Sequence, residues 1–215
     1  MIKGVIFDVD GTILDSMCIW RDLGIRYLNS VGVEAEDSIA DILYPMSLEE
    51  SSSYLKERFH LPDTVEKIKV DTLRLIENFY LNEVAVKEGL IDYLGYLNEN
   101  NIPMIIATSS DADLVRRTLE RMKISHFFKG ILTCTELGTS KREPYIYLQA
   151  SQFIDTDPKE TVVFEDVLHG IRAASSAGFI TVAVADPSNK PDRDELKKLS
   201  DYFIEDFSDS ILRTI

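Results

Sequence analysis

Short, mostly apolar runs alternate with helical stretches along much of the chain, and this alternation limits the fold more than any other feature. Each run is too short to be a buried helix and is bounded by turn residues, acids or proline. Strands that are apolar throughout are typical of a parallel sheet with helices on both faces. We therefore predict an α/β fold with a doubly wound, Rossmann-like parallel sheet. The expected strands cover residues 2–7, 102–107, 130–133, 161–166, 179–185 and 201–204.

One long helical stretch interrupts the alternation directly after the first strand. Apolar residues such as Trp20 and Tyr27 recur there at helical spacing. A segment of this length is too long to be a loop, so we predict an inserted, all-helical cap domain. Trp20 is expected in the core of this cap. The predicted boundaries are a catalytic core at 1–15 and 83–215 and a cap at 16–82.

Composition narrows the classes of function. The chain has 215 residues, of which 45% are hydrophobic, and a formal net charge of -14. This charge argues against a nucleic-acid partner and against a polybasic membrane contact. The two cysteines, Cys18 and Cys134, are far apart and favour a reduced, cytoplasmic setting without disulfides. The first apolar run is too short for a signal peptide, and we expect a monomer.

Polar side chains follow three of the predicted strands at the point where each strand ends. Asp8 and Asp10 follow the first strand, Thr108 ends another, and Glu165 and Asp166 end a third. Ligands of open parallel sheets bind beyond the carboxyl ends of the strands, so these residues are expected at one edge. Two carboxylates about 4 Å apart repel by roughly 4 kcal/mol at an effective dielectric near 20. Hard oxygen ligands without a neighbouring His or Cys cluster indicate Mg²⁺ as the balancing cation.

The charges also suggest how two acids divide the chemistry. Four carboxylates, one Mg²⁺ and the cation of Lys141 leave a single negative charge, which would repel an incoming phosphate. A proton on Asp10 removes that charge and makes Asp10 a general acid for a leaving alcohol. Asp8 is then the predicted nucleophile that attacks phosphorus.

At this point four motifs resemble those of a known family. They are "DVDGT" with Asp8 and Asp10, "IIAT" with Thr108, "SKREP" with Lys141, and "FEDVLHGI" with Glu165 and Asp166. Together they resemble the haloacid dehalogenase-like superfamily, in the branch with a helical cap that includes beta-phosphoglucomutase and phosphoglycolate phosphatase relatives. The resemblance implies a phosphoryl transfer through an aspartyl phosphate on Asp8, with Asp10 as acid and base.

The same resemblance implies the remaining site residues. Glu165 would support the metal directly or through water, and the backbone carbonyl of Asp10 would also bind it. The phosphate-binding residues would be Thr108, Ser109 and Lys141. The metal-binding residues would be Asp8, Asp10, Glu165 and Asp166.

Three functions follow from these residues. The first is a Mg²⁺-dependent phosphatase of a small phosphorylated metabolite, either a sugar phosphate or a nucleoside monophosphate. The second is a sugar-phosphate mutase similar to beta-phosphoglucomutase. Against it, Trp20 replaces the histidine of those mutases, and the segment "MSLEESS" lacks their cap arginine. The third is a phosphoacceptor signalling domain, which the long helical insertion disfavours.

Overall fold

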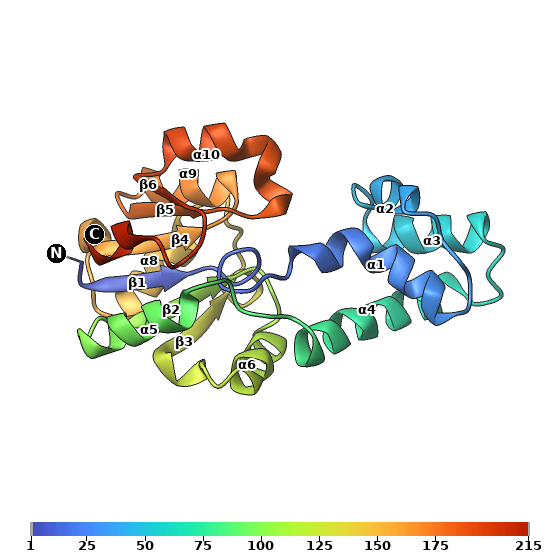
Figure 1. Cartoon of the computed structure of the whole chain (residues 1–215), viewed down its shortest axis with the longest axis horizontal. Helices are drawn as coiled ribbons and strands as arrows, with labels where there is room; N and C mark the ends of the chain where they lie inside the picture. Colours follow the sequence, from blue (N-terminus) through green and yellow to red (C-terminus); the bar gives the residue numbers. More distant parts are fainter. Residues whose placement is uncertain (1, 215) are drawn as a thin grey trace. The chain divides into compact units, whose positions relative to one another are not determined.

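The computed structural model describes residues 2–214 and divides the chain into two compact units (Figure 1). Met1–Asp15 with Ala85–Ile215 form the first, called the sheet unit, and Ser16–Val84 form the second, called the helical unit. The second boundary lies two residues beyond the predicted one. Leu14 pairs with Val86 there, and the amide of Asp15 donates to the carbonyl of Ala85 at 2.9 Å. These contacts include residues 85 and 86 in the sheet unit.

The sheet unit contains six parallel strands in the order β3-β2-β1-β4-β5-β6. This order confirms the predicted doubly wound α/β fold. It reverses direction between β1 and β4, and ligands of such sheets bind at this reversal. The strands are β1 (Gly4–Phe7), β2 (Met104–Thr108), β3 (Phe128–Thr133), β4 (Thr161–Glu165), β5 (Ile180–Val184) and β6 (Tyr202–Ile204).

Helices connect the strands and surround the sheet. The α-helices of this unit are α5 (Leu90–Glu99), α6 (Ala112–Arg121), α7 (Cys134–Leu137), α8 (Tyr145–Phe153), α9 (Leu168–Ser176) and α10 (Arg193–Leu199). The shorter 3₁₀ turns are η1 (Ser125–Phe127), η2 (Pro158–Glu160), η3 (Pro187–Asp192) and η4 (Ser210–Arg213).

Alternate residues of each strand point to opposite sides of the sheet. Both sets are apolar in the central strands, so both faces of the sheet are apolar there. On one face Ile6 and Val163 belong to a buried cluster with residues of α8 and α9. On the other face the rings of Phe7 and Phe164 stack with centroids 4.9 Å apart, and Tyr93 of α5 meets Phe164 edge-on at 5.7 Å. The central strands are therefore fixed from both sides directly before their terminal acids.

The helical unit contains α1 (Met17–Ser30), α2 (Ser38–Leu43), α3 (Leu48–Arg58) and α4 (Val65–Asn82). Tyr27, Leu55 and Ile68 lie in its buried core. Ser47 and Glu50 form a capping box at the start of α3, because each side chain bonds the backbone amide of the other residue. Over the described part of the chain, no helix is both long and apolar enough to cross a membrane.

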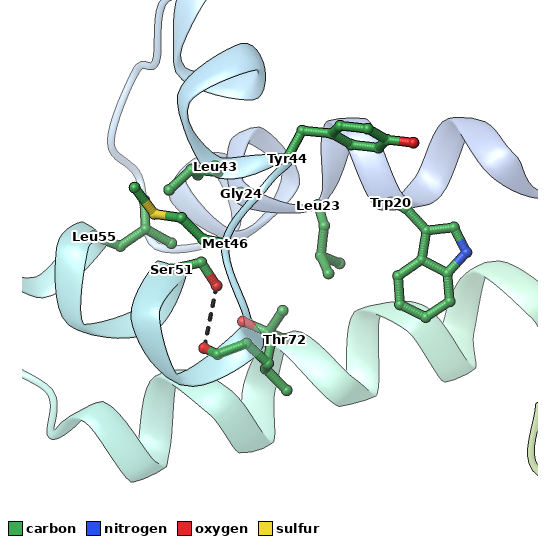
Figure 2. Close-up of a pocket in the computed structure, with 10 residues that line it drawn as sticks. Trp20, Leu23, Gly24, Leu43, Tyr44, Met46, Ser51, Leu55 and Thr72 are labelled. Atoms are coloured by element: carbon green, nitrogen blue, oxygen red, sulfur yellow. Dashed lines mark hydrogen bonds between the residues drawn. The ribbon is translucent and has the colours of Figure 1, made fainter. Parts of the chain in front are cut away.

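The expectation that Trp20 lies in the core of the helical unit is wrong. Its side chain is 40% exposed, whereas the neighbouring Ile19 is fully buried. Gly24 and Tyr27, four and seven residues further on, are buried on the same face of α1, so Trp20 has the direction of the buried stripe but lies in the first turn of the helix. It lines a cavity of about 170 Å³ inside the helical unit, together with Tyr44 and Met46 (Figure 2).

Candidate active site

The ends of β1 and β4 bring three carboxylates together. Asp8 follows β1, while Glu165 ends β4 and Asp166 follows it. The two strands are adjacent, with Phe7 opposite Phe164, and the amide of Asp8 donates to the carbonyl of Phe164 at 3.0 Å. One carboxylate oxygen from each acid lies within 4.8 Å of the other two, and all three residues are buried. The predicted gathering of these acids at one edge therefore takes place.

A lysine contacts two of these acids. Lys141 is only 5% exposed, and its ammonium donates to Asp8 Oδ1 and, at 2.7 Å, to Glu165 Oε1. Gly138 and the residues after it leave α7 in an irregular segment that ends where α8 begins. This segment places Lys141 at the edge of the sheet where Asp8 and Glu165 lie. The structure thus places Lys141 beside Asp8, as the sequence predicted.

Sequence reasoning missed a tyrosine that belongs to the same cluster. The hydroxyl of Tyr147, on α8, donates to Glu165 Oε1 at 2.7 Å, and the ring is fully buried. Glu165 Oε1 therefore accepts from both Lys141 and Tyr147. The apolar periodicity of this helix predicts that the ring is buried, but it does not show which partner the hydroxyl meets.

The electrostatics of the cluster follow from burial and from like charges. Burial, and then the neighbouring Glu165 and Asp10, raise the pKa of Asp8 to about 7, although Lys141 opposes this rise. Burial and the charges of Asp8 and Glu165 also raise the pKa of Asp166 well above its usual value. Burial alone would lower the pKa of Lys141, but the carboxylates of Asp8 and Glu165 outweigh it and raise that pKa. The acids therefore need more positive charge than one lysine supplies.

The residues present fit a divalent cation. Asp166 Oδ2 is buried and, among residues 2–214, has no hydrogen-bond partner. Its other oxygen, Oδ1, receives only a long contact of 3.5 Å from the hydroxyl of Thr12. A buried polar atom without a partner costs free energy and calls for an explanation. Mg²⁺ prefers oxygen ligands of this kind, so Asp8, Glu165 and Asp166 are suited to hold it.

Asp10 neighbours the three-carboxylate cluster but is not one of its members. It is only partly buried, and its Oδ2 accepts a hydrogen bond from the hydroxyl of Ser110, which the sequence reasoning did not single out. Thr108 is fully buried at the end of β2, and its hydroxyl accepts from the amide of Ser110 at 3.0 Å. Ser109 is exposed and donates from its hydroxyl to Cys134 Sγ at 3.5 Å. Ser110, in the loop after β2, therefore contacts both Asp10 and Thr108.

The fold and this cluster define an α/β enzyme whose site lies beyond the carboxyl ends of its central strands. A family model described as haloacid dehalogenase-like hydrolase matches residues 5–184. The chain belongs to this family, which confirms the resemblance drawn from the four motifs.

Relatives of known name support the same class. The chain is 24% identical over 178 residues to a phosphorylated carbohydrates phosphatase of Thermotoga maritima, covering 83% of this chain and 82% of that protein. It is 26% identical over 196 residues to hexitol phosphatase A of Escherichia coli, covering 90% and 88%. A crystal structure of a Thermotoga maritima protein assigned as a beta-phosphoglucomutase covers 99% of this chain and 97% of that one, with a TM-score of 0.87 and 22% identity. The likeness to this solved structure confirms the fold. The family model and the named relatives show that the enzyme is a phosphatase of this family.

Proposed function

We propose that the protein is a Mg²⁺-dependent phosphatase of a small phosphorylated metabolite and works through an aspartyl phosphate on Asp8. The observation that carries this proposal is the buried cluster in which Asp8 contacts Lys141 while Asp166 keeps an unpartnered oxygen. Phosphoryl transfer to an aspartate requires a nucleophilic carboxylate, a lysine that balances its charge and a carboxylate oxygen able to bind a metal ion.

Each residue then has a defined role. Asp8, Asp166 and the backbone carbonyl of Asp10 would hold Mg²⁺, with Glu165 supporting it directly or through water. The bound ion supplies positive charge against the phosphate oxygens. Lys141 balances the charge between Asp8 and the phosphoryl group. The phosphoryl oxygens would be bound by Thr108 and Ser109.

The two half-reactions use the same pair of acids. An oxygen of Asp8 attacks phosphorus, the bond from phosphorus to the substrate oxygen breaks, and Asp10 gives its proton to that oxygen. In the second half, water attacks the phosphorylated Asp8 while Asp10 takes up a proton. Inorganic phosphate leaves and Asp8 is restored. The hydrogen bond from Ser110 holds the carboxyl of Asp10 in place.

The substrate class is supported by the relatives' names, which include phosphatases of phosphorylated carbohydrates and of hexitol phosphates. We therefore favour a sugar phosphate over a nucleoside monophosphate. A sugar-phosphate mutase is the second candidate, because a structure of close overall fold is assigned as one. Trp20 and the absence of arginine from 46–52 argue against a bisphosphate intermediate.

The test is phosphate release from a panel of phosphomonoesters by purified protein, with Mg²⁺ and with EDTA. We expect release that depends on Mg²⁺ and is lost in Asp8→Asn. Asp113→Asn is the matched control, because Asp113 is an exposed carboxylate on α6 paired with Arg116. Folded wild-type protein that releases no phosphate from any ester with Mg²⁺ would refute the proposal. Conversion of a hexose 1-phosphate to its 6-phosphate with a bisphosphate primer would favour the mutase instead.

A further inference from the structure

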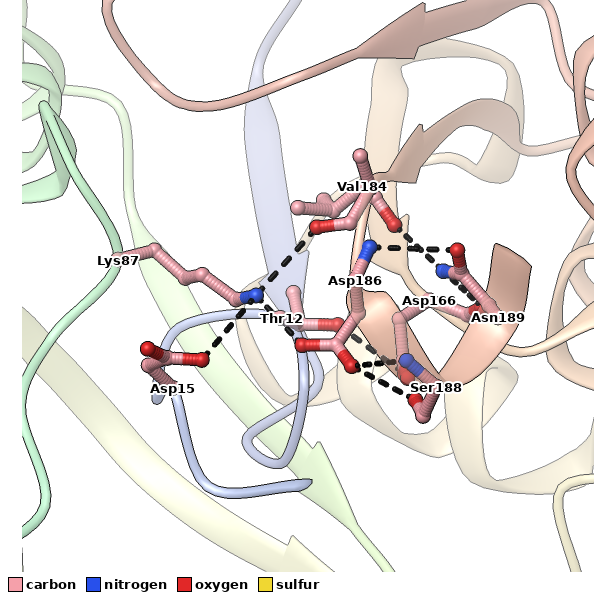
Figure 3. A network of polar contacts seen from close by, with 9 residues as sticks. Thr12, Asp15, Lys87, Asp166, Val184, Asp186, Ser188 and Asn189 are labelled. Atoms are coloured by element: carbon pink, nitrogen blue, oxygen red, sulfur yellow. Dashed lines mark hydrogen bonds and ion pairs between the residues drawn. The ribbon is translucent and has the colours of Figure 1, made fainter. Parts of the chain in front are cut away.

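A buried asparagine, Asn189, bonds the backbone carbonyl of Asp166 (Figure 3). Asn189 lies in η3, the turn that follows β5, and is buried. Its Nδ2 donates to the carbonyl of Asp166 at 2.9 Å and to the carbonyl of Val184 at 2.9 Å. Its Oδ1 accepts from the amide of Asp186 at 3.2 Å. The single amide group thus joins the end of β4 to the end of β5.

A buried ion pair holds the turn that carries Asn189. The side chain of Asp186 is fully buried, and it accepts from the amide of Ser188 at 2.9 Å and from its hydroxyl at 2.7 Å. The ammonium of Lys87 donates to Asp186 Oδ2 at 2.6 Å, and the Lys87 side chain is only 10% exposed. A paired and hydrogen-bonded buried carboxylate fixes its surroundings, whereas an unpaired one would destabilise them.

Lys87 in turn is fixed by the segments that lead into and out of the helical unit along the chain. Its backbone amide donates to the carbonyl of Ile13 at 3.0 Å. Its ammonium also donates to the carbonyl of Ala185 at 3.3 Å and lies 3.8 Å from Asp15 Oδ1. Figure 3 shows the side chain of Lys87 reaching from the irregular segment between α4 and α5 to Asp186. A continuous path therefore runs from Lys87 through Asp186 and Asn189 to Asp166.

We propose that Asn189 is a positioning residue for the metal ligand Asp166, and that Asp186 and Lys87 hold Asn189 in place. This inference rests on the proposed function. The reason is that, within residues 2–214, the Asp166 carboxylate has no strong hydrogen bond, since its one contact is with the Thr12 hydroxyl at 3.5 Å. It also faces two like charges, which push it away from the cluster. Its direction must therefore be set through its backbone, and Asn189 bonds that backbone.

The alternative is that Asn189 has only a structural role, because it forms a capping box with Asp186 at the start of η3. The two readings differ in one measurable quantity. A cap contributes to the stability of the fold, whereas a positioning residue also sets the affinity for the metal. Residues behind metal ligands typically change metal affinity or activity by 10–100-fold when removed.

The experiment compares Mg²⁺ binding to metal-free protein by titration calorimetry with the Mg²⁺ dependence of phosphate release. We expect Asn189→Ala to weaken Mg²⁺ binding about 10-fold or more, with most of kcat recovered at saturating Mg²⁺. Lys87→Met should weaken binding to a smaller extent, and Lys87→Arg should restore it because arginine keeps the ion pair with Asp186. The matched control is Lys190→Met, since Lys190 is an exposed lysine in the same turn.

The outcomes separate the two proposals. If wild-type protein binds no Mg²⁺, both the proposed function and this inference are refuted. If wild type binds Mg²⁺ and both folded variants, Asn189→Ala and Lys87→Met, bind within twofold of it, the inference alone is refuted. If Asn189→Ala does not fold, the comparison of Lys87→Met with Lys87→Arg decides, and equal affinity in the two refutes the inference.

Discussion

Without metal, replacing Asp8 by asparagine should stabilise the folded protein at neutral pH. Burial, followed by the charges of Glu165 and Asp10, raises the pKa of Asp8 to about 7 from an ordinary value of 3.8, against the pull of Lys141. The folded protein therefore keeps a proton on Asp8 that the unfolded chain releases. Ionisation in this window favours unfolding, so stability falls as the pH rises from about 4 to about 7. Asparagine resembles the protonated acid and avoids this loss.

The size of the effect follows from the two pKa values. A difference of about 3 units at 1.36 kcal/mol per unit gives about 4 kcal/mol once the pH is well above 7. At pH 5 only the lower part of the window has been crossed, and the same calculation gives about 2 kcal/mol. The free energy of unfolding of Asp8→Asn should therefore exceed that of wild type by about 4 kcal/mol at pH 8 and by about half as much at pH 5.

The assay is urea unfolding of both proteins in EDTA at the two pH values, repeated with Mg²⁺. Mg²⁺ at 100 times its Kd should narrow the difference at pH 8 to about 1 kcal/mol, because it stabilises wild type by about 2.7 kcal/mol and the variant has lost a ligand. Asp113→Asn should stay within about 0.5 kcal/mol of wild type at each pH, as an exposed residue. If Asp8→Asn is no more stable than wild type at pH 8 in EDTA, the reasoning fails and Lys141 alone balances Asp8.

Three further changes test the rest of the structure. Tyr147→Phe removes a hydrogen bond to the buried Glu165 and should cost about 2 kcal/mol in urea unfolding and lower kcat; an unchanged kcat would show that the tyrosine is only structural. Gly170→Ala places a Cβ about 2.6 Å from Glu165 Cδ and should cost about 1–3 kcal/mol, with loss of phosphatase activity; a variant as stable and active as wild type would contradict the packing described. Thr64→Ala removes the N-cap of α4 and should cost about 1 kcal/mol, seen as faster hydrogen exchange in its first turn; unchanged exchange there would contradict the cap.

The site could be predicted largely because parallel strands impose it. Apolar runs of strand length predict the strands of the sheet. In a parallel sheet, the residues that follow the strands all lie at the same edge. Asp8 and Asp166 are far apart in the chain but follow neighbouring strands, so their meeting needed no knowledge of side-chain packing. Lys141 was harder to place, because it lies in an irregular segment. The motif "SKREP" predicted that Lys141 belongs to the site, whereas hydrophobic periodicity gave no information about it.

The partners behind the acids could not be predicted, because they depend on how side chains pack. Tyr147 belongs to an apolar helical stripe, and the pattern does not reveal that its hydroxyl reaches Glu165. Asn189 follows a strand in a turn where asparagine is common for local reasons. Trp20 shows the limit of periodicity within the helical unit, since the pattern gives the direction of the buried stripe but not how far along the helix that stripe is covered.

The arrangement at β1 and β4 also explains how the fold tolerates so unfavourable a cluster. The residues just before the acids, Phe7 and Phe164, stack on each other and pack against Tyr93 and Phe207. Burial of these rings stabilises the strand ends by several kcal/mol, because each aromatic side chain removes a large apolar area from water. The apolar packing of the residues directly before the acids therefore holds together carboxylates that would otherwise move apart. The repulsion that remains is the free energy that a divalent cation recovers when it binds, so the same feature that weakens the metal-free protein strengthens its affinity for the ion.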